Sequence, residues 1–235
     1  MRPLVPPPVV GTFRERQPHE RLRLGVGLAL LVGEAPNVAT VGRPEAWLAP
    51  AVTGRRHAGN RLGRWSGLRP SRFRAVFDRT NLFAEPPAPW PIAAARAQGE
   101  TLLLGLGERE PRPTVLLGRK VCDAFGLSGS RFAGWYCWHL RHLETVQVEA
   151  PELEQLAAPC GSHGRELSVS DLELARRHRA IYLAAAPHPS SRSRLWNAPQ
   201  ELERARTFWT KLANLLAAWS DVLHASELAP PGGPC

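Results

Sequence analysis

Short apolar runs, each ended by a glycine, a proline or a polar residue, recur along the chain and predict buried β-strands. There are three such runs, at 28–32, 114–118 and 181–186, and residues 77–82 are a further short strand candidate with an amide near its end. Apolar residues at helical spacing predict a helix over 92–106, and a shorter helix is expected near 62–68. Strands that alternate with helices are typical of an α/β fold, and 235 residues are enough for one sizeable domain.

The C-terminal part of the chain carries the clearest helical signal. Asn197 is a good N-cap, Pro199 suits a first turn, and Gln200 stands three residues after the cap. We expect this helix to be structural, with apolar residues between 202 and 223 on its buried side. Residues 1–22 are predicted to be a flexible arm and 227–235 a tail, which leaves 23–226 as a single domain.

Charge indicates the class of partner. The chain holds 30 Lys and Arg against 21 Asp and Glu, a net charge of +9, and Lys120 and Lys211 are the only lysines. An arginine-rich, basic protein attracts nucleic acid, although a GC-rich genome also favours arginine codons. No apolar stretch has the length of a membrane span, and the first residues lack the apolar core of a secretion signal. We therefore expect a cytoplasmic, monomeric protein.

The first predicted strand ends in Gly33-Glu34-Ala35-Pro36-Asn37. A glycine lets the backbone turn sharply, and a proline restricts the residue before it to extended conformations. Glu34 and Asn37 are therefore expected at the carboxyl end of a strand, where open α/β sheets bind their ligands. An ordinary strand-to-loop turn has the same pattern, so this motif alone does not assign a function.

The other three strand ends also carry candidate residues: Asn81 with Phe83, Gly118-Arg119-Lys120, and His188-Pro189-Ser190-Ser191. In this order the chain resembles the uracil-DNA glycosylase superfamily. Residues 33–36 are similar to its first motif in the glutamate-bearing form, and residues 188–190 to its second motif. The resemblance covers about residues 28–215, apart from 139–178. It implies a three-layer α/β/α sandwich with a short, mainly parallel four-stranded sheet.

The resemblance also implies an activity, the hydrolysis of the N-glycosidic bond of a pyrimidine nucleotide flipped out of DNA. The enzyme would be a monofunctional glycosylase that leaves an abasic site. Glu34 would stabilise positive charge on the sugar and orient water, and His188 would donate a hydrogen bond to the departing base. The base would bind between the motif residues Gly33, Ala35, Pro36 and Asn37, the amide of Asn81 and the ring of Phe83.

DNA contacts are expected from the loop after the histidine and from the start of the helix after the third strand. Hydroxyl and guanidinium groups are suitable donors to phosphates, and Leu195 or Trp196 would wedge into the vacated base stack. The loop over 38–64, rich in arginine, would border the site or form a solvated surface. The predicted DNA-binding residues are Ser190, Ser191, Arg192, Arg194, Arg119 and Lys120.

Asn37 bears on the choice of base. The strictly uracil-specific branch of the superfamily carries a tyrosine at this position, which blocks the C5 face of the pyrimidine. Asparagine would leave room for a C5 substituent, and some bacterial members remove hypermodified pyrimidines from phage DNA as antiviral defence. Uracil repair is an alternative, because the glutamate-bearing branch lacks that tyrosine too. A non-catalytic DNA-binding relative and a nucleotide- or nucleoside-processing enzyme are further alternatives.

Residues 139–178 depart from the family pattern and are predicted to form an added segment beside the sheet. Helices are expected at 151–158 and, after a capping box of Ser170 and Glu173, at 174–180. The aromatic run 132–138 before this segment predicts a strand, for which a place in the core is favoured over a base-stacking platform.

Five residues around this segment have spacings that a zinc ion accepts: Cys137, His139, His142, Cys160 and His163. Two Cys-x-x-Cys pairs would be a far stronger signal, and histidines scattered on a DNA-facing surface explain the pattern better. Some relatives carry an iron–sulfur cluster, but its cysteine pattern is absent here. We therefore expect no metal and no other cofactor.

Overall fold

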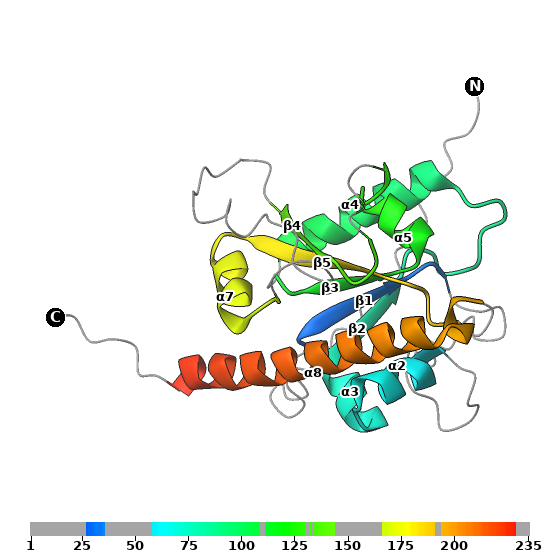
Figure 1. The fold of residues 1–235 in the computed structure, drawn as a ribbon. Helices are drawn as coiled ribbons and strands as arrows, with labels where there is room; N and C mark the ends of the chain where they lie inside the picture. The colour runs from blue at the N-terminus through cyan, green and yellow to red at the C-terminus, as the bar shows by residue number, and fades with distance from the viewer. Residues whose placement is uncertain are drawn as a thin grey trace.

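The computed structural model describes residues 27–35, 58–108, 111–129, 132, 134–143, 166–190 and 194–228. These residues form an α/β fold in which a mainly parallel sheet has helices on both faces (Figure 1). Five strands pair in the order β2-β1-β3-β5-β4.

Four of the strands run parallel: β1 (Ala29–Gly33), β2 (Phe77–Asn81), β3 (Thr114–Leu117) and β5 (Ala180–Ala186). They confirm the four predicted strands to within one residue at each end. Every residue of β1, β3 and β5 is buried, as expected of parallel strands covered on both faces. The register sets Gly33 beside Asn81 and Leu117 beside Ala186, so the four carboxyl ends lie at one edge of the sheet.

The prediction of a four-stranded sheet was wrong by one strand. The fifth strand, β4 (Trp138–His142), pairs antiparallel with β5, with Trp138 opposite Ala184 and His142 opposite Ala180. It begins in the aromatic run and continues into the segment predicted to be an insertion. Its residues change from buried to exposed along its length, which is typical of an edge strand. Because arginine and histidine interrupt its apolar pattern, the sequence signal for this strand was weak.

Helices α4 (Ile92–Glu108) and α5 (Arg119–Ala124) lie on one face of the sheet, and α4 confirms the helix predicted over 92–106 (Figure 1). The other face carries α2 (Ala58–Ser66), α3 (Pro70–Val76) and the long helix α8 (Pro199–Leu228). Helix α7 (Val169–Arg177) precedes β5 and packs against it and α8. A short 3₁₀ helix, η4 (Arg194–Asn197), leads into α8.

Two hydrophobic clusters, one on each face, hold the helices to the sheet. In the first cluster α8 buries Ala205, Phe208, Leu212, Leu216 and Trp219, which confirms that this helix is structural. Each large side chain buried in this way stabilises the fold by about 1.5–3 kcal/mol. The second cluster joins α4 and α5 to the alternate residues of the same strands.

Three helix starts differ from the prediction. The capping box of α7 is formed by Ser168 and Asp171, two residues before the predicted pair, and the helix ends at Arg177 because β5 begins at Ala180. Both frames match the capping pattern, and the observed one buries Leu172 and Ala175 against the core. Helix α2 begins at residue 58 rather than near 62, and α8 begins at Pro199, two residues after Asn197, the predicted cap, which is the last residue of η4.

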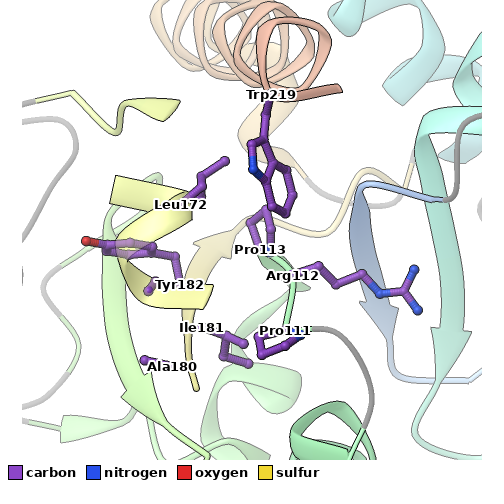
Figure 2. Close-up of a pocket in the computed structure, with 9 residues that line it drawn as sticks. Pro111, Arg112, Pro113, Leu172, Ala180, Ile181, Tyr182 and Trp219 are labelled. Carbon is purple, nitrogen blue, oxygen red and sulfur yellow. The ribbon is translucent and has the colours of Figure 1, made fainter. Parts of the chain in front are cut away.

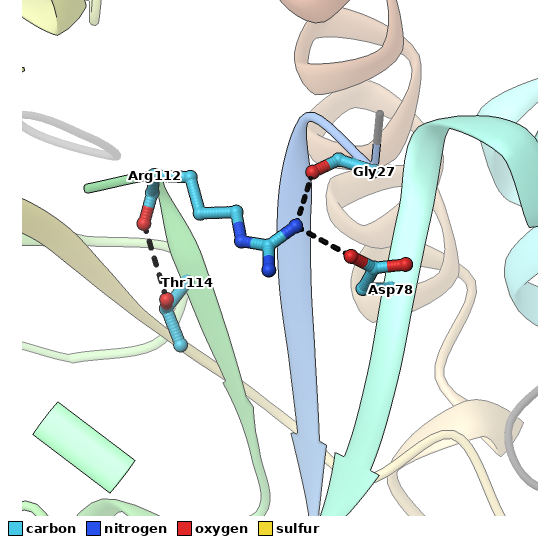
Figure 3. A network of polar contacts seen from close by, with 4 residues as sticks. All are labelled: Gly27, Asp78, Arg112 and Thr114. Carbon is cyan, nitrogen blue, oxygen red and sulfur yellow. Dashed lines mark hydrogen bonds and ion pairs between the residues drawn. The ribbon is translucent and has the colours of Figure 1, made fainter. Parts of the chain in front are cut away.

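The amino edge of the sheet is held by a polar network around Arg112 (Figure 3). The Nη1 group of Arg112 donates to the carbonyl of Gly27 at 2.6 Å and pairs with the Asp78 carboxylate. A Cβ at Gly27 would collide with the Asp78 carboxylate, so a glycine is needed there. The Thr114 hydroxyl donates to the Arg112 carbonyl at 3.2 Å. The network joins the starts of β1, β2 and β3 and lies at the edge opposite the candidate chemistry.

None of the helices in the described part of the chain is both long and apolar enough to cross a membrane.

Candidate functional site

The candidate site lies at the carboxyl edge of the sheet and is centred on four residues: Glu34, Asn81, Gly118 and His188. Backbone hydrogen bonds tie the strand exits together there. The amide of Phe83 donates to the Glu34 carbonyl at 3.1 Å, and the amide of Gly118 donates to the Ala186 carbonyl at 2.7 Å. The exits of β1 and β2 are thus joined, as are those of β3 and β5, which agrees with the crevice expected of an open α/β sheet.

Gly118 brings the carboxylate and the histidine to the same place. A Cβ built on Gly118 would lie 3.3 Å from the His188 Cβ and 3.8 Å from Glu34 Oε1. The backbone of Gly118 has a φ of +99°, a conformation that side chains with a Cβ rarely adopt. Glu34 and His188 therefore lie on either side of position 118. Both the backbone conformation and the limited space at this position favour glycine.

The surroundings of His188 favour one protonation state. Its Nδ1 accepts a hydrogen bond from the backbone amide of Ser190 at 3.2 Å, so the ring proton of the neutral form lies on Nε2. Burial lowers the pKa of His188, and the nearby Glu34 carboxylate opposes this shift. The ring is therefore held as a neutral imidazole with Nε2–H as its donor.

Glu34 is paired with a lysine in this arrangement. Lys120 Nζ lies 3.3 Å from Glu34 Oε2 and 5.0 Å from the centre of the Trp90 ring. Because the lysine side chain is 52% exposed, solvent screens the pair, and a contact of this kind stabilises a fold by at most about 1 kcal/mol. A substrate can separate the two side chains at low cost, which leaves the carboxylate available for chemistry.

Helix α2 supports the loop that carries His188. The Arg61 guanidinium donates from Nη1 to the Ser190 carbonyl at 3.1 Å, and the Trp65 ring packs against Trp196 at a tilt of 48°, with ring centres 4.6 Å apart. Trp196 in turn donates from Nε1 to the His188 carbonyl at 3.2 Å. Trp196, which the sequence offered as a wedge, thus holds the loop in place.

The described part of the chain brings together nine of the predicted residues: Gly33, Glu34, Ala35, Asn81, Phe83, Arg119, Lys120, His188 and Ser190. Four others, Pro36, Asn37, Ser191 and Arg192, lie outside the described residues, and Arg194 is described only as the start of η4.

Sequence reasoning missed two contributors to the site, Trp90 and Arg61, and it named Gly118 only as a candidate at a strand end, without its place between Glu34 and His188. A glycine directly after a buried strand was a usable signal for Gly118. Trp90 stands between two prolines in the connector after β2, and nothing in its local pattern indicates a contact with Lys120. Arg61 was one of several arginines in a basic stretch, and only the fold singles it out.

The candidate zinc ligands of the described residues do not converge. His139 and His142 both lie in β4, where an odd spacing puts side chains on opposite faces of the sheet. The Cys137 thiol lies 3.8 Å from the Trp135 carbonyl. No group of three or more His, Cys, Asp and Glu residues suited to a metal occurs in the part of the chain that the structure describes. Cys160 and His163 lie outside it.

A small cavity lies at the other end of the sheet, between the chain before β3, the start of β5, and helices α7 and α8 (Figure 2). Its walls include Pro111, Ile181, Leu172 and Trp219. Its volume is about 10 Å³, room for about one water molecule. It therefore holds no substrate, and the carboxyl edge remains the place where polar groups converge.

No protein-family model and no curated protein matches this chain.

Proposed function

We propose that this protein is a DNA glycosylase that hydrolyses the N-glycosidic bond of a flipped-out pyrimidine and leaves an abasic site. The single observation that carries the proposal is the meeting of the Glu34 carboxylate and the neutral His188 imidazole across Gly118. The helices on both faces of the parallel strands agree with the α/β/α layering that the superfamily resemblance implies.

The two groups suit the two charges that develop as the bond breaks. Positive charge grows on the sugar, where the Glu34 carboxylate stabilises it and orients the attacking water. Negative charge grows on the base, where His188 Nε2–H donates to a carbonyl oxygen. The neutral His188 ring keeps its Nε2 proton at neutral pH, and the Ser190 amide already holds the ring in its orientation. Asn81, beside Gly33 in the register, reads the pyrimidine edge.

The substrate we propose is a C5-substituted pyrimidine in phage DNA, removed as antiviral defence in the cytoplasm. This choice rests on Asn37 in place of a blocking tyrosine. It is tested by incubating the protein with DNAs that contain uracil, hydroxymethylated or glucosylated pyrimidines, followed by mass spectrometry of the released bases. Release of uracil alone would favour base-excision repair instead.

Catalysis itself is tested with Glu34→Gln, which keeps the shape of the side chain and removes its charge. We expect single-turnover base release to fall by about a hundredfold or more, since one electrostatic group aimed at the transition state contributes about that much. DNA affinity and the unfolding midpoint should stay close to those of the unaltered protein.

The matched control is Glu100→Gln, which removes the same charge from the exposed surface of α4. It should release base at the unaltered rate. A Glu34→Gln variant that is as fast as this control would remove Glu34 from catalysis. No base release by any variant, with DNA binding retained, would favour a non-catalytic DNA-binding relative.

A further inference from the structure

Three segments that are far apart in the sequence place aromatic rings and cations together beside the candidate site. The connector after β2 supplies two rings, the start of α5 supplies two cations, and the chain before β4 supplies two more rings. We name them the aromatic–cation cluster: Phe83, Trp90, Arg119, Lys120, Phe132 and Trp135.

The contacts inside the cluster are specific. The Arg119 guanidinium lies 4.2 Å from the centre of the Phe132 ring and 5.4 Å from that of Trp135. Phe132 and Trp135 meet edge to face with ring centres 5.1 Å apart. A cation over an aromatic ring is attracted by the partial negative charge of the ring face. A guanidinium in this position still has its outer face and its N–H groups free to contact a ligand.

A second pair of rings flanks the neighbouring lysine. Phe83 and Trp90 meet edge to face at 5.3 Å, and the Lys120 ammonium lies over the Trp90 ring. All four rings are half-buried, whereas Arg119 and Lys120 are exposed. The rings pack on one side against the hydrophobic cluster of α4 and α5, and they leave partly open ring surface beside the two exposed cations.

This composition fits one kind of partner. Stacking on aromatic side chains binds nucleobases of any sequence, and adjacent cations bind the phosphates between them. In a duplex the base faces are stacked inside the helix and do not reach a ring on a protein surface. The complementary partner of the cluster is therefore a strand whose bases are unpaired.

We infer that the aromatic–cation cluster binds an unpaired DNA strand next to the nucleotide in the candidate site. The inference rests on the proposed function for the nucleotide in the candidate site. Lys120 contacts both Trp90 and Glu34, so it joins the cluster to that site and the strand would continue from one to the other. It adds a strand preference, single over double, which the sequence motifs do not specify.

The test is fluorescence anisotropy with a labelled oligothymidylate and with the same strand annealed to its complement, using the full chain at several salt concentrations. The unaltered protein should bind the single strand at least about tenfold more tightly than the duplex. Trp90→Leu and Trp135→Leu should each weaken single-strand binding about tenfold, the usual effect of removing one stacking ring.

The matched control uses the two lysines of the chain. Lys120→Gln should weaken single-strand binding and lower its salt dependence by about one phosphate contact, whereas Lys211→Gln on the exposed side of α8 should change neither. If a tryptophan variant does not fold, as judged by its thermal transition, Lys120→Gln and Arg119→Gln decide the outcome because both side chains are exposed.

Equal affinity for single strand and duplex would overturn the inference, as would unchanged single-strand affinity in the cluster variants. Oligothymidylate carries no modified base, so its binding is measured independently of base release. Strand binding that depends on the cluster without any base release would remove only the proposed function. Base release from duplex DNA that is insensitive to the cluster variants would remove only this inference.

Discussion

At the scale of single residues, the structure explains how one histidine can act as a neutral donor. The Ser190 amide occupies Nδ1 of His188, and burial lowers the pKa of the ring below its ordinary value of 6.5. A lowered pKa means that the folded protein disfavours the imidazolium form. The neutral ring therefore persists at pH values where an exposed histidine would already be charged.

This state predicts the pH dependence of base release. We expect single-turnover release to stay constant down to pH 6.5 and to fall only below it, as His188 becomes protonated. The linked stability has the same sign, since stability that is fully present above pH 6.5 is lost as the pH falls from there towards the lower folded pKa. A pH series of the release rate for the unaltered protein and for His188→Gln checks this, because the variant should lose the fall in rate on the acidic side that His188 causes. A fall in the release rate centred above pH 6.5 would contradict the lowered pKa of His188.

Asn37 carries a second prediction at this scale. If Asn37 leaves the C5 face of the base open, Asn37→Tyr should suppress the release of a substituted pyrimidine about a hundredfold more than that of uracil, which is typical of steric exclusion. Paired single-turnover measurements on the two substrates give the ratio. Equal losses on both would mean that residue 37 does not face C5.

At the scale of elements, α7 shows how a local signal is resolved by packing. The segment 168–173 offers two capping frames, and the frame that begins at Ser168 places Leu172 and Ala175 against the core. In that frame the Asp171 amide donates to Ser168 Oγ at 3.3 Å, and Asp171 Oδ2 accepts from the Ser168 amide at 2.8 Å. The unused frame leaves Ser170 exposed.

Replacing the cap therefore has a predictable cost. Ser168→Ala should lower the free energy of unfolding by about 1 kcal/mol, the usual effect of losing an N-cap side chain. Ser170→Ala, in the frame predicted from sequence, should change it by less than about 0.5 kcal/mol. Urea denaturation of the two variants compares the frames directly, and a larger loss for Ser170→Ala would reverse the assignment.

At the scale of the whole molecule, the net charge of +9 agrees with the nucleic-acid partner that we propose for the site at the carboxyl edge of the sheet. If the loop after His188 holds phosphates, replacing Arg192 and Arg194 by glutamine should reduce the slope of log affinity against log salt by about two. The control, Arg176→Gln with Arg177→Gln, removes the same charge from α7, which precedes the amino end of β5. Salt titrations that show the same slope in both double variants would place the loop away from DNA.

Much of the fold follows from the sequence because its signals are local. Continuous apolar runs mark strands buried on both faces, and a glycine or a proline after a run marks its exit. These rules place Glu34 and His188 at strand ends from the local pattern alone, whereas the strand that ends at Asn81 has no continuous apolar run. They misplace β4, since the strand predicted over the aromatic run 132–138 begins only at Trp138, and an edge strand with charged residues has no continuous apolar run.

The site as a chemical arrangement was decided only by the tertiary structure. The meeting of Glu34 with His188 across Gly118 depends on strand order and register, which pair segments more than 60 residues apart. The pairing of Lys120 with Glu34 and Trp90 depends on three separate chain segments in the same way. The local sequence pattern predicts which residues stand at each strand end. Long-range packing determines which of these residues touch. Those contacts then decide the protonation state of the histidine and the partner of each charged side chain.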